Sequence, residues 1–225
     1  MSAYSIMLIV GTIAMCVITI LRRAHYNLSI VKSTMFSLIL TVVGVIGCKL
    51  LYIIENYELV KEQGLTFGGF SFYGAVFLIP ISFLALGRLF SLKPLQAVDL
   101  CAPGVAIMIS FMRIGCFIDG CCGANPIEFC GRTIHLPVQL MESAYDFVLL
   151  IVLWSLERAS KASGKLYPVF MVAYGVMRFG IEFLRDTPKD WLYMSHGQWY
   201  SLVAILVGVV WILLYRNKKE LSDGI

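Results

Sequence analysis

Seven apolar stretches of this chain are each long enough to cross a membrane, and little sequence lies between them. A hydrocarbon core of about 30 Å needs roughly 17 to 25 helical residues to span it. The chain of 225 residues is 59% hydrophobic and only 14% charged, whereas soluble domains average about 25% charged residues. The expected spans are Ser5–Leu21, Met35–Ile54, Ser71–Phe90, Val98–Ile118, Pro137–Leu156, Leu166–Leu184 and Gly197–Tyr215.

These stretches predict an all-α integral membrane protein with seven transmembrane helices. Because nearly all of the chain is span, we expect residues 1–225 to form a single domain, with no room for a second folded unit. The net charge of +4 does not indicate nucleic-acid binding, since the basic residues flank the spans and relate to membrane topology.

The basic residues also predict the orientation. Of the 18 lysines and arginines, eleven fall in one set of connections and four in the opposite set, and three lie within spans or at their ends. Cytoplasmic connections carry the excess of basic residues, so we expect the N-terminus outside and the C-terminus in the cytoplasm. No basic stretch precedes the first apolar segment, and Arg22 and Arg23 follow it. This pattern favours a retained first helix over a cleaved signal peptide.

Two arginines interrupt the apolar stretches: Arg113 in the fourth and Arg178 in the sixth. An arginine at bilayer depth costs about 2.5–3.5 kcal/mol on insertion scales, and such residues usually face the bundle interior with a partner. A guanidinium group offers five donors in a fixed fork and keeps its charge, which suits a phosphate or carboxylate. We therefore predict a polar cavity that receives an anion. The structural alternative pairs Arg113 with Asp119 or a carbonyl group.

Acidic residues at helical spacing could partner these arginines. Arg178 and Glu182 are four residues apart and share a helix face, with Tyr174 one turn earlier. Alone, Arg178 and Glu182 could form a self-neutralising pair. Glu142 lies one turn into the fifth span, with Asp146 one turn further on the same face. A carboxylate there could orient an arginine or act as a base.

Four of the seven cysteines, Cys116, Cys121, Cys122 and Cys130, cluster at the outer end of the fourth span. An oxidising exterior would allow one disulfide among them. Their spacing matches no common zinc finger, and a catalytic thiolate needs an adjacent cation, which Arg113 could supply. We expect structural or disulfide roles for them and no bound metal or cofactor. A thiol-redox function for Cys116, Cys121 and Cys122 is an alternative.

Four segments in order carry a family resemblance: VDLCAPGVAIMISFMRIGCFIDGCCG, LPVQLMES, YGVMRFGIEFLRD and SHGQWYS. Together they resemble the signature segments of the bacterial phosphatidylglycerol:prolipoprotein diacylglyceryl transferase family. The resemblance covers nearly the whole chain, and IGCKLLY and LRRA match more weakly. It implies a multi-pass protein of the bacterial cytoplasmic (inner) membrane, with seven spans and an external N-terminus.

The resemblance also implies a transferase of lipoprotein biosynthesis. Members of this family move a diacylglyceryl group from phosphatidylglycerol to the thiol of a prolipoprotein lipobox cysteine, so the expected partners are this phospholipid, the prolipoprotein signal peptide and the membrane. Two arginines are expected to hold the glycerol-phosphate head group. The implied catalytic residues are Arg113, Arg178, Tyr73 and Glu142, and the implied substrate-binding residues are Tyr4, Tyr174, Glu182, Cys116, Gly120 and Gln139.

The sequence departs from the family pattern at three polar positions. Tyr73 and Leu136 stand where the family has histidines, and Cys116 stands where it has asparagine. The large external insertions of the family are mostly absent. An unperturbed tyrosine titrates near pH 10, so Tyr73 is a poor base at neutral pH but could donate a hydrogen bond. Two alternatives follow: a paralogue acting on a different lipid or acceptor, and a non-enzymatic phospholipid-binding membrane protein.

Overall fold

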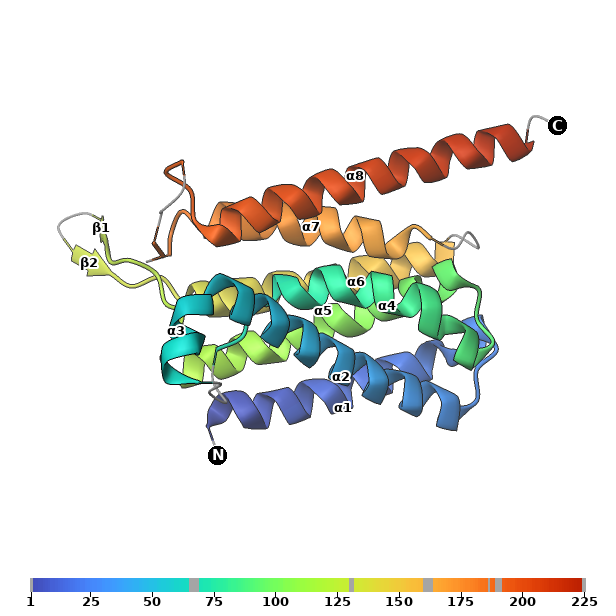
Figure 1. The fold of residues 1–225 in the computed structure, drawn as a ribbon, viewed down its shortest axis with the longest axis horizontal. Coiled ribbons are helices and arrows are strands. Elements are labelled where there is room, and N and C mark those ends of the chain that lie inside the picture. Colours follow the sequence, from blue (N-terminus) through green and yellow to red (C-terminus); the bar gives the residue numbers. More distant parts are fainter. Residues whose placement is uncertain are drawn as a thin grey trace.

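The structure, a computed structural model, describes residues 2–64, 69–129, 132–159, 164–185, 187–188 and 192–223. Its long helices run side by side, with α1 and α8 on opposite sides of the bundle (Figure 1). The N-terminus lies at the same end as α3 and the hairpin of β1 and β2 (Figure 1). The elements are α1 (Ala3–Arg22), η1 (Arg23–Tyr26), α2 (Ile30–Glu55), α3 (Tyr57–Gln63), α4 (Tyr73–Leu86), η2 (Gly87–Phe90), α5 (Pro94–Ile118), β1 (Ile127–Phe129), β2 (Arg132–Ile134), α6 (Val138–Ala159), α7 (Leu166–Ile181) and α8 (His196–Asp223).

The prediction of an α-helical membrane protein is confirmed. Six helices of the described chain are long and apolar enough to cross a membrane. The seventh, α7, has 16 residues and a length of about 24 Å. It ends early because the N–H groups of Phe183 and Leu184 donate to carbonyls three residues back, which tightens the chain into a turn. The seven spans of the sequence prediction are therefore six helical segments long enough to cross a membrane, with α4 counted together with η2 as Tyr73–Phe90, and the shorter α7.

Two small elements were not predicted from the sequence. The helix α3 follows α2, and the antiparallel hairpin of β1 and β2 joins α5 to α6. Each strand has three residues. These elements are too short to give a clear hydrophobic period, which explains why pattern alone did not reveal them.

Close backbone contact joins α2 to α4. A Cβ atom added at Gly74 would overlap the carbonyl oxygen of Gly47 on the facing helix. Small residues allow this approach, and dispersion contacts between closely packed backbones hold helices together in lipid.

A buried ionic network closes the end of the bundle away from the N-terminus. The guanidinium group of Arg22 on α1 donates from Nε to Glu157 on α6 over 2.7 Å, and from Nη1 to the carbonyl of Leu100 on α5 over 2.9 Å. At this end the carboxylate of Asp99 accepts hydrogen bonds from the backbone N–H groups of residues 164–167, which lead into α7. Arg22, which follows the first expected span, is therefore not part of an exposed connection but a buried link between three helices.

We predict that Arg22→Ala strongly destabilises the protein. The substitution leaves the buried carboxylate of Glu157 without its charge partner, a change that costs about 3–5 kcal/mol. Thermal unfolding in detergent micelles measures the loss. The matched control is Arg88→Ala, which removes an exposed arginine from η2. Equal unfolding temperatures for the two variants would contradict the structural role of Arg22.

Candidate functional site

Glu142 on α6 is the centre of a buried charge cluster. It is 0% exposed, and each of its carboxylate oxygens serves a different arginine. Glu142 Oε2 lies 2.8 Å from Nε of Arg113 on α5, and Oε1 lies 2.6 Å from Nη1 of Arg178 on α7. Arg113 and Arg178, separate in sequence, therefore share one site. Neither side chain stands alone against lipid.

A second glutamate and a third arginine extend the cluster. Arg178 Nη2 lies 2.7 Å from Oε2 of Glu182, four residues along the chain. Arg185 places Nη1 3.8 Å from Glu142 Oε1 and Nε 3.8 Å from Glu182 Oε2. Arg185 lies just beyond the expected sixth span and is not among the predicted site residues. Its spacing of three residues from Glu182, on a turn that continues the helix face, was the available signal.

The cluster has more donors than its paired carboxylates use. Three guanidinium groups bring five N–H donors each, and the ion pairs engage the oxygens of two glutamates. The side chains of Arg113 and Arg178 keep 13% and 10% of their surface exposed. Asp146, one turn beyond Glu142, is buried, and among the described residues neither of its oxygens has a hydrogen-bond partner. Such a cluster can accept a further anion at its exposed donors.

The start of α8 holds Glu182 in place. Ser195 Oγ donates to Glu182 Oε1 over 2.9 Å. Ser195 and Gln198 form reciprocal bonds at the helix start, since Ser195 N donates to Gln198 Oε1 and Gln198 N donates to Ser195 Oγ. This capping arrangement fixes both the helix end and the serine hydroxyl. The SHGQWYS motif is therefore part of the site, although Ser195 and Gln198 were not among the predicted site residues.

Tyr73 lies beside the cluster but has another hydrogen-bond partner. Its hydroxyl is 2.6 Å from Ser201 Oγ, and Ser201 Oγ in turn donates to the carbonyl of Gly197 over 2.6 Å. The tyrosine is therefore the donor to Ser201. Its ring centroid lies 5.8 Å from that of Tyr174, which is itself buried near Arg113 and Arg178. Tyr73 and Tyr174 thus form an aromatic pair close to the arginines.

Tyr4 connects the N-terminal end of α1 to the same region. Its backbone N–H and that of Ala3 donate to the two carboxylate oxygens of Asp119, each over 2.9 Å. Asp119 therefore caps α1, and the alternative in which it pairs with Arg113 is wrong. The side chain of Tyr4 lies near Arg113 and Cys116 and points into an apolar cavity.

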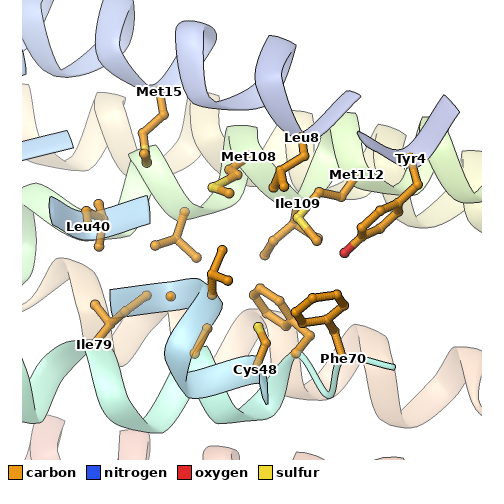
Figure 2. Close-up of a pocket in the computed structure, with 15 residues that line it drawn as sticks. Tyr4, Leu8, Met15, Leu40, Cys48, Phe70, Ile79, Met108, Ile109 and Met112 are labelled. Carbon is orange, nitrogen blue, oxygen red and sulfur yellow. The ribbon is translucent and has the colours of Figure 1, made fainter. Parts of the chain in front are cut away.

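The cavity lies between α1, α2, α4 and α5 and has a volume of about 60 Å³. Figure 2 shows methionine, leucine and isoleucine side chains converging on it from both sides, with Tyr4 and Phe70 at one end. Met112, next to Arg113 in the chain, is part of its lining, but no arginine of the cluster is. The site therefore has an ionic part and an adjoining apolar part.

Gln139 and Gly120 shape the loop that follows α5. Gln139 Nε2 donates to the carbonyl of Cys121 over 2.7 Å, so α6 holds this loop. Gly120 has a φ of +68°, a left-handed conformation that favours glycine. No hydrogen bond joins either residue to an arginine of the cluster among the described side chains.

Cys116, Cys121 and Cys122 gather at this loop as free thiols. Their Sγ atoms all lie within 4.8 Å of one another. The disulfide that this cluster would allow is not formed among these three thiols, and Cys130 lies outside the described residues. The hydrogen bond from the Cys116 thiol, followed by the charges of Arg185 and Arg113, holds the pKa of Cys122 well below its ordinary value.

Comparisons with known proteins agree with the motifs. The model of the family described as prolipoprotein diacylglyceryl transferase matches residues 1–214. A phosphatidylglycerol–prolipoprotein diacylglyceryl transferase of Clostridium tetani is 34% identical over 197 residues, which cover 79% of this chain and 78% of the relative. A second, from Clostridium perfringens, is 33% identical over 202 residues, covering 80% and 77%. One from Finegoldia magna is 24% identical over 237 residues, covering 98% and 93%. The resemblance drawn from the motifs is confirmed.

We predict that Gly197→Ala disturbs the cluster. An added Cβ would lie 2.9 Å from Glu182 Oε1, so the carboxylate must move away from Arg178 and Ser195. A loss of about 1–3 kcal/mol is expected, measured by thermal unfolding in detergent. Gly180→Ala is the control, because nothing lies within 4 Å of its Cβ. If Gly197→Ala is as stable as Gly180→Ala, Glu182 is not held as described.

Proposed function

Because this chain belongs to the prolipoprotein diacylglyceryl transferase family, we propose that it transfers the diacylglyceryl group of phosphatidylglycerol to the thiol of a prolipoprotein cysteine. The family consists of multi-pass transferases of the bacterial cytoplasmic membrane. The observation that carries the proposal is the pairing of Arg113 and Arg178 on one buried glutamate, Glu142. This arrangement holds two arginines at membrane depth and leaves some of their N–H groups available to a ligand.

In the proposed reaction the two arginines bind the phosphate of the lipid head group. The sulfur of the acceptor attacks the glycerol carbon that bears the phosphate ester. A carbon–sulfur bond forms, the carbon–oxygen bond to phosphate breaks, and glycerol phosphate leaves with the electron pair. The thiol proton passes to solvent or to the departing phosphate. Fixed guanidinium donors stabilise the charge that develops on this leaving group.

The other predicted site residues have supporting roles. Glu142 and Glu182 orient the arginines through the ion pairs described above. Tyr174 lies near the guanidinium groups, and Gln139 holds the loop that carries Gly120 and follows Cys116 on the acceptor side. A residue that fixes a charged neighbour in this way contributes by preorganisation.

The apolar cavity is the proposed place for an acyl chain. Its lining consists of aliphatic, methionine and aromatic side chains, and its outer end at Tyr4 approaches Arg113. Acyl chains remain in an apolar environment while the phosphate reaches the arginines. The same cavity would exclude water from the tails next to the reacting bond.

The site lies at the outer face in this proposal. Arg113 and Arg178 are near the ends of α5 and α7, on the side of the bundle that carries the N-terminus and the hairpin (Figure 1). Most of the basic connections lie at the opposite end, which the positive-inside rule assigns to the cytoplasm. The N-terminus is thus outside and the C-terminus inside.

Purified protein in liposomes tests the function directly. Vesicles containing phosphatidylglycerol, with a cysteine-containing lipobox peptide, should yield the thioether-linked lipopeptide and glycerol phosphate, both detected by mass spectrometry. A peptide with serine in place of the cysteine and vesicles of phosphatidylcholine are the controls. Binding of phosphatidylglycerol without product would instead favour the non-enzymatic reading. Transfer only from another lipid would favour the paralogue.

We predict that Arg113→Ala and Arg178→Ala abolish transfer and that Arg113→Lys restores little of it. Lysine keeps the charge but loses the planar fork that engages two oxygens at once. Each variant is assayed for lipopeptide formation after its folding has been checked by thermal unfolding. Arg88→Ala, exposed on η2, should keep full activity. Wild-type turnover in Arg113→Lys would show that charge alone is sufficient.

We predict that Tyr73→Phe lowers turnover and costs stability of only about 1 kcal/mol, because the ring volume stays and one hydrogen bond to Ser201 is lost. Tyr73→His, which places the family residue there, should be tolerated. Ser201→Ala, which removes the partner, serves as the companion variant. An inactive but folded Tyr73→His protein would indicate a pocket rebuilt for different chemistry.

A further inference from the structure

Three thiols converge at the outer end of α5, where Cys116 stands in place of the asparagine of the family pattern. Cys116 is buried on the last turn of the helix, and Cys121 and Cys122 are exposed on the loop that follows. The N–H of Cys121 donates to the carbonyl of Cys116 over 3.0 Å, which folds the loop back on the helix. Gln139 anchors the same loop from α6.

The backbone of Cys122 turns its thiol toward the other two. Its φ is +62°, a left-handed conformation that non-glycine residues rarely adopt. Strain of this kind persists where the surrounding structure requires it and often marks a functional position. Here it brings the third sulfur to the pair formed by Cys116 and Cys121, so that all three lie within 4.8 Å of one another.

This spacing fits a shared metal ion. Zinc–sulfur bonds of about 2.3 Å place the ligand sulfurs of a tetrahedral site roughly 3.8 Å apart. Cys121 and Cys122 are exposed and can make the small inward movement that closes the site. Thiolates are soft ligands that select zinc-class ions over magnesium and calcium.

The charges around the thiols support the same reading. Three thiolates around Zn²⁺ carry one net negative charge. The guanidinium groups of Arg113 and Arg185 are close enough to Cys122 to interact with it electrostatically. These two positive charges would stabilise the negative complex, whereas a carboxylate in the same place would repel it.

The site would have a free coordination position. Within the part of the chain that the structure describes, no fourth histidine, cysteine, aspartate or glutamate joins the three sulfurs. Structural zinc sites are closed by four protein ligands, whereas sites with three protein ligands keep one position for water or substrate. A three-thiol site beside the phosphate-binding arginines is therefore open toward the reaction.

We propose that Cys116, Cys121 and Cys122 bind one zinc ion whose fourth position takes the sulfur of the acceptor cysteine. This inference rests on the proposed function. Coordination replaces the S–H bond of the acceptor by an S–Zn bond, releases the proton to solvent and changes no oxidation state. A metal deprotonates a thiol that coordinates it, which supplies the activation that Tyr73, bonded to Ser201, does not provide.

Cobalt provides a direct test of the metal site. Reduced, metal-free protein in detergent should bind one Co²⁺ with the intense thiolate-to-cobalt absorption of a tetrahedral site, and one Zn²⁺ should abolish that absorption. Cys121→Ser and Cys122→Ser should each weaken Zn²⁺ binding by more than about 100-fold, because even outer-shell changes cost 10–100-fold. Cys16→Ser in α1 is the matched cysteine control and should bind as the parent does. The proposed site would be overturned if Co²⁺ gave no thiolate-to-cobalt absorption, or if Zn²⁺ bound to each of the two serine variants as tightly as to the parent.

The acceptor role has its own readout. Adding the lipobox peptide to the Co²⁺-loaded protein, with no phosphatidylglycerol present, should shift the visible bands, and the serine peptide should not. Identical spectra with both peptides would overturn the fourth-ligand role. Transfer by metal-free protein at the full rate would overturn the inference and leave the proposed function standing. A peptide-dependent spectral shift without any transfer would refute the proposed function and leave the metal site standing.

Discussion

The architecture of this protein depends on one carboxylate, Glu142, which is shared between arginines from two other helices. A lone arginine in lipid is costly, and a lone buried carboxylate is equally so. The pairing therefore brings α5, α6 and α7 together at one end of the bundle. Further layers build on it: α8 reaches Glu182 through Ser195, and α4 reaches α8 through the bond of Tyr73 to Ser201.

The two ends of the bundle use buried arginine differently. Arg22 donates to Glu157, to Tyr26 and to helix carbonyls, and its side chain has no exposed surface that a ligand could reach. Arg113 and Arg178 are also paired with glutamate, but part of each side chain is open. The arginines at the two ends differ in how much of the guanidinium group remains accessible, and not in their charge. An enclosed arginine whose N–H groups are bonded within the protein has a structural role, whereas an arginine with accessible N–H groups can bind a ligand.

The sequence shows which charged residues lie within apolar spans, but it does not show how the backbone and the neighbouring side chains are arranged around them. Arg113 and Arg178 were found because each interrupts an apolar run, and Glu142 because it shares such a run. Arg185 was missed because it lies beyond the end of α7, where a basic residue is read as part of a connection. Whether cysteines join in a disulfide depends on the orientation of each Sγ atom, which spacing along the chain does not contain. The turn that shortens α7 likewise depends on backbone bonds that hydrophobic pattern does not reveal.

The pattern of change across the site separates two tasks. The residues that face the proposed phosphate, Arg113, Arg178 and their glutamates, keep the family pattern, since a leaving anion of fixed charge requires fixed cations. Of the three positions that differ, Tyr73, Cys116 and Leu136, we place Cys116 on the side where the acceptor thiol enters in the proposed reaction. Cys116 joins two further thiols there. A nucleophilic sulfur can be prepared by a base, by a neighbouring cation or by a metal, and these solutions are interchangeable as long as a thiolate reaches the carbon. In the proposed reaction the leaving phosphate requires fixed cations, whereas the acceptor thiol can be activated in several ways. The residues around the acceptor thiol are therefore those that can differ from the family pattern while the reaction is retained.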